Sequence, residues 1–388
     1  MSYKSFEFTF PTRIVFGPGE SGRAAEHAAQ FDPKKIFLMT YADVLLPVVK
    51  KLMADLTEKG IPYILYDKCT ANPTAEQIDT AAAVCSREGC DLVLGVGGGS
   101  VIDSAKSTAL LVTNPSEGGI WDYVSYVKEP QNRPLTVMLV VTIASTGSEG
   151  NESFVITDRA GKDKLIFNHP FVKPVLSVCD PELAKTLPPR QTALGAIDVF
   201  SHVLEQYLHD DPAADASDEM SFGLLKTVHK WAPVAVAEPD NMDARSNLLW
   251  CAILAMSRVL GVGHEENWLG HMLEHAVSAK FNLAHAAGMA AIMPAYLEFI
   301  EAKGQIPGKL GRLAELLGAE TASEGLKKFQ RELNLPTDLA EALGHGASEE
   351  EIAEMAEHSL PWGPTEAACL GEFTKEDAEA IFRRCFGE

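Results

Sequence analysis

Short apolar runs that alternate with helical patterns dominate the first 180 or so residues of this chain. The runs are KIFLMT (35–40), PYILYD (62–67), DLVLGVG (91–97), LTVMLVVTI (135–143) and PVLSVCD (174–180). Helix-like segments lie between them, and one of these follows Thr74, a favourable N-cap, and ends at Gly89. Strands that alternate with helices of this length predict a parallel, doubly wound sheet.

The second half of the chain has a different pattern. After DPELAKTLPPRQT no strand pattern remains, and helical segments follow one another with short Gly, Pro and Asp turns between them. A chain of 388 residues exceeds what one hydrophobic core usually supports. We therefore predict an α/β domain over residues 1–184 and an all-helical domain over 185–388, with Pro188-Pro189 near the linker.

Charge and cysteine content restrict the partners and the compartment. The chain has 33 basic and 54 acidic residues, a net charge of −21, which argues against nucleic acid and anionic membranes. It has no apolar run of membrane-spanning length, and MSYKSFEFTF lacks the apolar core of a signal peptide. Seven cysteines without a CxxC motif indicate reduced thiols. We expect a cytoplasmic protein that acts on a small molecule.

A glycine-rich turn stands between an apolar strand and a helical pattern. Gly97, Gly98, Gly99 and Ser100 follow the run Leu92–Val96. Free N–H groups and the positive end of the helix dipole make such a turn suitable for a phosphate, and glycines allow close approach. The turn is neither G-x-G-x-x-G nor a Walker loop. Two interpretations stay open: a pyrophosphate site, or a turn that only closes the strand tightly.

Asp198, His202, His271 and His285 have the composition of a metal site. Asp198 and His202 are four residues apart, which places them on one helix face, and His271 and His275 repeat that spacing. Histidines on helices are often structural, but these lie in otherwise apolar segments built to be buried. Three imidazoles and a carboxylate suit Fe(II) or Zn(II). A buried cation is a Lewis acid for a carbonyl or alkoxide oxygen, so we expect chemistry on alcohols and aldehydes.

Several motifs together resemble one known family. They are GGGS at 97–100 followed by Asp103 and Lys106, TGSE at 146–149, DPELAKTLPPRQTALGAIDVFSH, and the histidine constellation. In this order, over nearly the whole chain, they resemble the iron-dependent (group III) alcohol dehydrogenases. LPPRQ, EQY at 205–207 and His285-Ala286 are most similar to the butanol dehydrogenase and broad-range aldehyde reductase branch.

The resemblance implies a role for each candidate residue. Asp198, His202, His271 and His285 would ligate the metal, whereas His275 would lie beside nicotinamide and substrate and relay protons. The turn Gly97–Ser100 would hold the pyrophosphate. The cofactor cleft would also be lined by Asn72, Asp103, Lys106, Thr142, Thr146 and Ser148. Asp103 has an alternative role as an acid in the first turn of the helix, where it complements the helix dipole. Lys106 has an alternative position on a solvated helix face. Glu149 and Glu205 have no role we can assign.

The mechanism that the resemblance implies is hydride transfer. The cofactor would lie across the carboxyl ends of the strands, with its nicotinamide in a cleft between the domains. The metal would bind the substrate oxygen, polarise the C=O group and stabilise the alkoxide, and a proton would come from water or through His275. The reverse reaction would oxidise a primary alcohol. The resemblance also implies a homodimer.

The residue after the first strand of the dinucleotide fold bears on cofactor choice. NAD-preferring relatives have an aspartate there that binds the ribose 2′-OH, whereas this chain has Tyr41, followed by Ala42 and Asp43. Without the carboxylate there is no repulsion of a 2′-phosphate. We therefore favour NADP(H) over NAD(H), although Asp43 offers a replacement acid.

Three other functions have to be weighed. A glycerol-type polyol dehydrogenase shares the fold, but its usual ligands are one Asp and two His, one fewer than here. A dehydroquinate-synthase-like lyase would need additional Lys and Arg for a phosphorylated acid, and none lies in the ligand motifs. A non-catalytic metal-binding protein would not need the dinucleotide motif.

Overall fold

The chain forms two compact units in a computed structural model that describes residues 4–387. One unit is Thr9–Thr186. The other is Leu187–Glu388 together with the N-terminal residues up to Phe8. The sequence-based division, at 184/185, assigns that N-terminal segment to the α/β domain instead.

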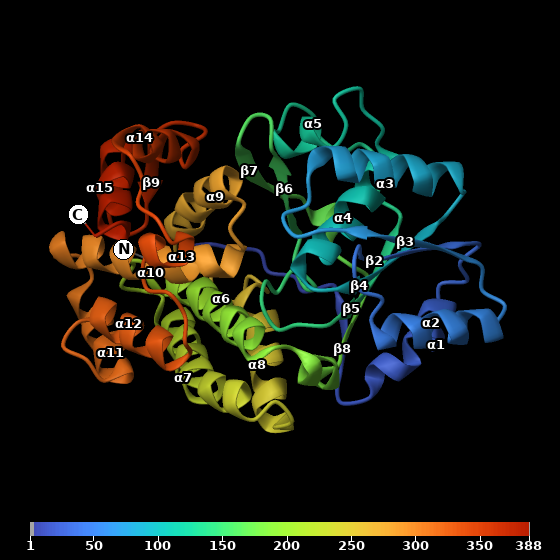
Figure 1. Ribbon diagram of the computed structural model, residues 1–388, viewed down its shortest axis with the longest axis horizontal. Coiled ribbons are helices and arrows are strands. Elements are labelled where there is room, and N and C mark those ends of the chain that lie inside the picture. Colours follow the sequence, from blue (N-terminus) through green and yellow to red (C-terminus); the bar gives the residue numbers. More distant parts are fainter. Residues whose placement is uncertain (1–3, 388) are drawn as a thin grey trace. The chain divides into compact units, whose positions relative to one another are not determined.

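A six-stranded parallel sheet forms the centre of the α/β unit, as predicted (Figure 1). Its strands, in spatial order, are β1 (Arg13–Phe16), β8 (Leu176–Cys179), β5 (Thr136–Val141), β4 (Leu92–Gly97), β2 (Ile36–Tyr41) and β3 (Tyr63–Cys69). From β2 the chain proceeds outward to β3, and from β4 it proceeds in the other direction to β5 and β8. The topological switch point, where ligands bind in open α/β sheets, therefore lies between the carboxyl ends of β4 and β2.

Helices cover both faces of this sheet (Figure 1). On one face α1 (Ala24–Ala29) and α2 (Pro47–Glu58) pack against the sheet through a core that includes Leu52, Leu94 and Val140. On the other face lie α3 (Ala75–Arg87) and α4 (Gly99–Thr113). Thr74 caps α3 in a capping box with Gln77, as the sequence predicts.

Smaller elements complete the unit. A β-hairpin, β6 (Ser153–Asp158) and β7 (Asp163–Asn168), packs on the α4 side with the short helix α5 (Trp121–Val124). Single helical turns are η1 (Glu20–Arg23), η2 (Pro170–Val172) and η3 (Pro181–Thr186). The strands β1, β6 and β7 are not anticipated by the sequence analysis.

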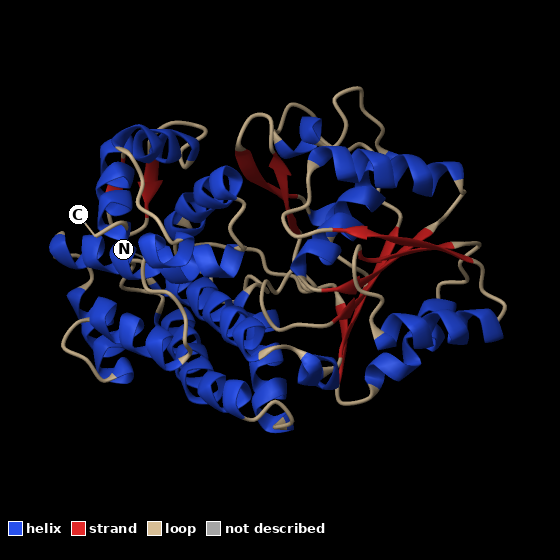
Figure 2. Cartoon of the chain, in the orientation of Figure 1, coloured by secondary structure: helices blue, strands red, loops and turns tan. Residues whose placement is uncertain are grey.

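The second unit is helical, which confirms the predicted fold class (Figure 2). Its helices are α6 (Pro189–Tyr207), α7 (Asp215–Ala237), α8 (Met242–Ala255), α9 (Leu269–Phe281), α10 (His285–Ala302), α11 (Pro307–Leu317), α12 (Ala322–Glu332), α13 (Leu339–Leu343), α14 (Glu349–His358) and α15 (Lys375–Cys385). One small exception to the expected absence of strands is the hairpin of β9 (Thr365–Ala367) and β10 (Gly371–Phe373). Pro188 and Pro189 begin α6 as its N-cap and first residue.

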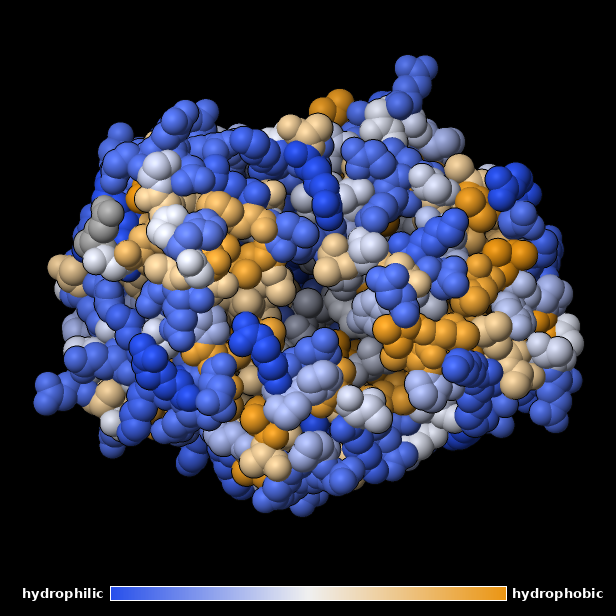
Figure 3. Space-filling view, in the orientation of Figure 1, coloured by the Kyte–Doolittle hydropathy of each residue, from blue (hydrophilic) through white to orange (hydrophobic). Residues whose placement is uncertain are grey.

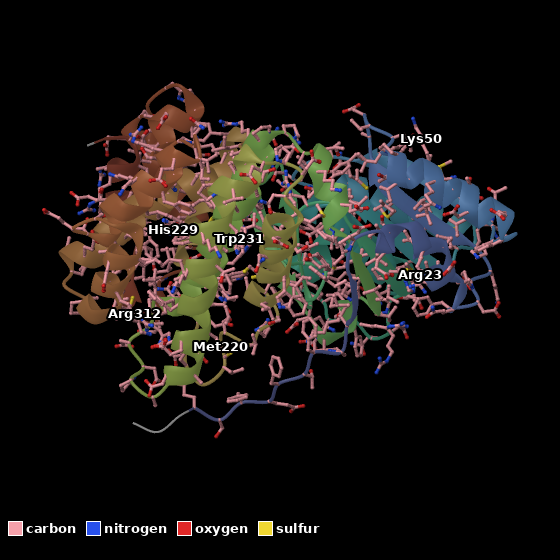
Figure 4. The ribbon with its side chains drawn as sticks, turned by 90° about the horizontal axis from the view of Figure 1, so that it is seen from below. Arg23, Lys50, Met220, His229, Trp231 and Arg312 are labelled. Carbon is pink, nitrogen blue, oxygen red and sulfur yellow. The ribbon has the colours of Figure 1, made fainter. Side chains whose placement is uncertain are left out.

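The longest helix, α7, packs on α6 and α8, and its other side is partly exposed. Figure 4 shows Met220, His229 and Trp231 projecting from it, with Arg312 of α11 nearby. The Arg312 guanidinium lies 3.8 Å from the centre of the Phe222 ring, a cation–π contact.

The surface fits the composition. The face in Figure 3 is mostly hydrophilic, and its apolar residues gather in patches, most clearly on the right of the view. Within residues 4–387, none of the helices is long and apolar enough to span a bilayer. All seven cysteines are buried and free.

Candidate functional site

Four of the predicted site residues meet inside the helical unit. One potential ligand atom from each of Asp198, His202, His271 and His285 lies within 4.8 Å of those of the other three. Asp198 and His202 come from α6, His271 from α9 and His285 from the first position of α10. Three helices therefore bring together residues that are up to 87 positions apart in the sequence.

Helix geometry and burial place these side chains. Nearly every residue of α6 from Thr192 onward is buried, so Asp198 and His202 point into the unit from one helix face. The rings of His202 and His271 stack with centroids 4.6 Å apart, and those of His271 and His285 are 5.2 Å apart. The Nε2 atom of His285 lies 3.5 Å from Oδ1 of Asp198.

The donor atoms fit a divalent cation. The buried atoms Nδ1 of His202 and Nε2 of His271 have no hydrogen-bond partner among the described residues. Burial lowers the pKa of His202 to about 3, so its imidazole is neutral and has a lone pair to donate. Unsatisfied buried polar atoms are rare in proteins, and a bound cation would satisfy these. The set of three imidazoles and one carboxylate suits Fe(II) or Zn(II).

Two buried glutamates stand behind the histidines. Glu205 accepts a hydrogen bond from Nδ1 of His271 and another from its backbone N–H, and Glu274 accepts from Nδ1 of His285. Burial opposes protonation of His271, but the Glu205 carboxylate outweighs it and raises the pKa of that histidine. Carboxylates in this position fix the ring orientation and leave Nε2 for a metal.

Glu205 has no role assigned from the sequence, and Glu274 is not among the residues predicted from it. A signal was nevertheless present. Each glutamate lies three residues after a candidate ligand (His202 or His271), one helical turn further along a buried helix. A buried carboxylate in an apolar helix needs a hydrogen-bond donor. Each candidate histidine ligand has a second ring nitrogen that can supply one.

Trp268 also lies at the site and is not predicted from the sequence. Its indole ring meets His271 edge-on, with centroids 5.4 Å apart at 79°, and lies 6.3 Å from the ring of His202. The indole N–H donates to Glu266. Trp268 thus forms an apolar wall beside the four-residue cluster.

His275 lies beside the cluster and outside it. Its ring centroid is 6.5 Å from that of His271 and 5.8 Å from that of His285. It forms a separate grouping of possible ligands with Glu274 and His285. The geometry is compatible with the non-ligating role that the resemblance implies.

The predicted phosphate turn lies at the switch point of the sheet. Gly97 ends β4, Gly98 is the N-cap of α4 and Gly99 is the first residue of that helix. The first N–H groups of a helix have no acceptor within it, so they are available to an anion. A Cβ atom on Gly98 would lie 2.5 Å from Cγ2 of Ile143, and one on Gly99 would lie 2.6 Å from Cγ2 of Thr146. Only glycine fits at these two positions.

Tyr41 lies against the same turn. It ends β2, and its hydroxyl accepts a hydrogen bond of 2.7 Å from the Gly98 N–H. Burial raises the pKa of Tyr41, so the phenol is uncharged at neutral pH. The tyrosine therefore supports the turn and adds no negative charge. Asp43 follows in an exposed bend.

Two threonines and Asn72 also gather at the carboxyl edge of the sheet. The Thr142 N–H donates to the carbonyl of Gly97 at 3.1 Å, directly after β5. Thr146 packs on Gly99. Asn72 lies in the turn between β3 and α3 in a left-handed conformation, with φ of 48°.

A buried hydrogen-bonded cluster, here called the bracket, lies beneath this edge and consists of Asp103, Lys106 and Ser148. The Lys106 ammonium, with no exposed surface, donates to Ser148, Asn151 and Ser153. Asp103 accepts from the Ser148 hydroxyl and from the Val155 N–H. The alternative of a solvated helix face for Lys106 is therefore wrong. These contacts hold the segment 148–155 against α4.

A neighbouring carboxyl group, that of Glu149, is buried with one of its two oxygen atoms unsatisfied within residues 4–387. Glu149 is 2% exposed, and its Oε1 atom has no hydrogen-bond partner among the described residues. Burial raises its pKa to about 7. The carboxyl group therefore binds a proton in the folded state at pH values where the unfolded chain has lost it.

Glu149→Gln is expected to stabilise the protein above pH 7. Because the folded-state pKa is raised, the contribution of Glu149 to stability is present below its unfolded pKa and is lost as pH rises to about 7. The neutral amide avoids this loss, which is about 3 kcal/mol at pH 8 for a rise in pKa from 4.5 to about 7. Urea unfolding at pH 5 and pH 8 would measure it. Equal stability of variant and wild type at pH 8 would contradict the prediction.

Both halves of the chain match models of one protein family. Residues 11–181 match the family described as iron-containing alcohol dehydrogenase, and residues 192–386 match the Fe-containing alcohol dehydrogenase family, C-terminal. The NADH-dependent butanol dehydrogenase B of Clostridium acetobutylicum is 32% identical over 299 residues, which are 76% of this chain and 75% of that protein. The NADPH-dependent aldehyde reductase YqhD of Escherichia coli (strain K12) is 30% identical over 87% of this chain and 89% of its own.

A solved structure is similar over its full length. The crystal structure of NADH-dependent butanol dehydrogenase A from Thermotoga maritima superposes with a TM-score of 0.90, 29% identity and 100% coverage of both chains. With both halves matched and relatives at this identity, the chain belongs to the iron-containing alcohol dehydrogenase family and is an NAD(P)-dependent oxidoreductase of alcohols and aldehydes.

Proposed function

We propose that this chain reduces small aldehydes such as butyraldehyde to primary alcohols with NADPH, and catalyses the reverse oxidation. The ligands for Fe(II) or Zn(II) are Asp198, His202, His271 and His285. The observation that carries the proposal is the meeting of these four donors within 4.8 Å in a buried site. The names of the relatives, butanol dehydrogenase and aldehyde reductase, support the substrate class.

Residues of the helical unit have separate roles in the proposed reaction. A bound metal supplies Lewis acidity toward the substrate oxygen, as a bound nicotinamide supplies hydride. Glu205 holds the ring of His271 in one orientation, and Trp268 limits the access of water on one side of the cluster. His275, which lies next to the ligands without joining them, carries the proton to or from the product oxygen.

The α/β unit holds the dinucleotide in this proposal. The turn of Gly97, Gly98, Gly99 and Ser100 binds the pyrophosphate. The first N–H groups of α4, those of Gly99 and Ser100, donate to it, while the Gly98 N–H is held by the Tyr41 hydroxyl. Thr142, Thr146 and Asn72 surround this turn at the same edge. The bracket of Asp103, Lys106 and Ser148 supports the edge from beneath, since its polar atoms are engaged with the segment 148–155.

The preference for NADP(H) rests on position 41. The relatives' names divide between NADH and NADPH, so they do not decide the matter. Tyr41 is uncharged and its hydroxyl is engaged with Gly98. A 2′-phosphate would meet no carboxylate at the end of β2, and repulsion is what usually excludes it.

We expect a lower KM for NADPH than for NADH, and a reversed preference in Tyr41→Asp. The new carboxylate would accept from the ribose 2′-OH and repel the 2′-phosphate, an effect of at least about tenfold in the ratio of kcat/KM values. Steady-state kinetics with both cofactors would measure it. Tyr41→Phe is the matched control, because it removes the hydrogen bond to Gly98 without adding charge.

Two outcomes would count against this assignment. A strong NADH preference in the wild type would mean that Asp43 or a backbone group reads the ribose. A reversal in Tyr41→Phe as large as in Tyr41→Asp would mean that the support of Gly98 matters and the charge does not.

The activity itself is tested by two assays run side by side. One follows oxidation of NADPH with butyraldehyde, and the other follows formation of dehydroquinate from a phosphorylated acid substrate. Glycerol oxidation tests the polyol alternative. Turnover of butyraldehyde alone would support the proposal, and turnover of either alternative substrate alone would replace it.

We further propose that the enzyme is a cytoplasmic homodimer. Seven buried free cysteines suit a reducing compartment. The N-terminal segment offers exposed apolar surface for a second copy, since the side chains of Phe6 and Phe8 are 53% and 40% exposed.

A further inference from the structure

Two histidines of the cluster share an arrangement that the ligand set does not require. Behind His271 lies Glu205, and behind His285 lies Glu274, each bonded to the Nδ1 atom. Neither glutamate has exposed surface. Each carboxylate also occupies space that a helix glycine leaves open, Gly270 for Glu205 and Gly288 for Glu274.

The space beside Gly288 is tightly fitted to Glu274. A Cβ atom at position 288 would lie 2.7 Å from Oε1 of Glu274 and 2.8 Å from its Cγ. Gly288 lies inside α10, where glycine is disfavoured relative to alanine. Any larger residue would push the Glu274 side chain away from its present position.

The carboxylate of Glu274 has both oxygens engaged. Oε2 accepts from His285, and Oε1 accepts from the hydroxyl of Ser278, one turn further along α9. The two contacts fix the rotamer of Glu274 and hence the plane of the His285 ring. With Nδ1 committed as the donor, Nε2 of His285 is left facing Asp198.

The helix dipole gives Glu274 a second effect. His285 is the first residue of α10, so the positive end of that helix lies beside the cluster. A positive helix end opposes a cation. A buried carboxylate at the same place offsets this field and makes the imidazole a stronger donor.

We propose that Glu274, seated by Gly288, is a positioning residue that holds His285 with Nε2 toward the metal and strengthens metal binding. The inference rests on the proposed metal site and goes beyond its four ligands. It also implies that Gly288 serves the site without contacting a ligand. A competing role exists, since Glu274, His275 and His285 themselves lie within ligand distance of one another and could hold a second cation.

The test uses the full chain stripped of metal and titrated with Co²⁺. Glu274→Gln keeps the shape of the side chain and removes its charge. We expect Kd for Co²⁺ to rise between about 10-fold and 100-fold, with a shifted d–d absorption band. The Tm of the metal-free variant should stay within about 2 °C of the wild type, since the substitution is isosteric.

Glu298→Gln is the matched control. Glu298 lies on α10 as well, but its carboxylate pairs with Lys327 near the surface. Its replacement by glutamine should leave the Co²⁺ affinity and the spectrum unchanged. A loss of affinity in this variant equal to that in Glu274→Gln would overturn a specific role for Glu274.

Gly288→Ala tests the same inference from the other side. The added methyl group displaces the Glu274 carboxylate, so Co²⁺ affinity should fall as it does in Glu274→Gln. The double variant should be little weaker than either single variant, because both changes remove one interaction. Fully additive losses would overturn the link between the two residues.

The remaining outcomes separate this inference from the proposed function. A wild type that binds no Co²⁺ overturns the metal site itself. A wild type that binds one Co²⁺, with Glu274→Gln equal in affinity and spectrum, overturns the inference alone. A fall from two bound ions to one in Glu274→Gln makes Glu274 a ligand of a second cation, which also overturns it.

Discussion

Alanine in place of His271 or His285 is expected to strip the metal and abolish aldehyde reduction while the chain stays folded. Each substitution removes one of the four proposed ligands, and the Lewis acid would be lost with the metal. Loss of several kcal/mol of transition-state stabilisation corresponds to a fall in kcat/KM of at least about 10³-fold. Metal content by mass spectrometry and NADPH oxidation with butyraldehyde would be measured on the same preparation.

His275→Ala is the matched control for the ligand variants. Its ring lies beside the cluster, 5.8 Å from that of His285, and outside the four-residue set. The variant should keep its metal and turn over more slowly. Loss of its metal would mean that the ligand set is assigned wrongly, and full activity of a metal-free His271→Ala would rule out the Lewis-acid mechanism.

Gly98→Ala is expected to weaken dinucleotide binding strongly and to destabilise the α/β unit. The new methyl group would lie 2.5 Å from Cγ2 of Ile143 and 3.0 Å from the Tyr41 hydroxyl. The turn has to move, and the hydrogen bond from Gly98 to Tyr41 breaks. We expect a destabilisation of about 1–3 kcal/mol, the usual cost of overpacking. Affinity for NADPH should fall at least about 100-fold, since the glycines let the backbone approach the pyrophosphate. Fluorescence titration and thermal unfolding would measure the two effects.

Gly223→Ala controls for the general effect of adding a methyl group. Gly223 lies in α7, and a Cβ atom there would meet nothing within 4 Å. This variant should be as stable as the wild type or more so, by about 0.5–1 kcal/mol, since alanine favours helices. If Gly98→Ala binds NADPH like the wild type, the pyrophosphate lies elsewhere.

The central strands could be predicted because buried strands are continuous apolar runs in the sequence. All six residues of β4 are buried, and the run from Leu92 to Gly97 is apolar without interruption. In contrast, β1 has four residues with exposed ends, and β6 and β7 form a hairpin outside the six-stranded sheet. The partner of β1 is β8, which is distant in the sequence, and β6 and β7 pair locally. A hydropathy pattern encodes neither pairing.

The candidate site divides in the same way. The spacing of Asp198 and His202 follows from helix geometry, so one sequence is enough to suggest it. The surroundings of Lys106 could not be predicted, because its acceptors lie 42 to 47 residues away. The contact of Glu274 with His285 likewise depends on how α9 meets α10, which tertiary packing decides.

The four candidate metal ligands all belong to the helical unit, and the glycine turn with its supporting residues belongs wholly to the other. The binding of metal and the binding of dinucleotide are therefore each linked thermodynamically to the folding of a different unit. A ligand at 100 times its Kd stabilises the fold that binds it by about 2.7 kcal/mol. Chelation would then lower the unfolding temperature of one cooperative unit, and excess dinucleotide would raise that of the other. We therefore expect that removal of metal from the proposed site would leave the proposed nucleotide site folded, and that added cation would restore the metal site without refolding of the whole chain.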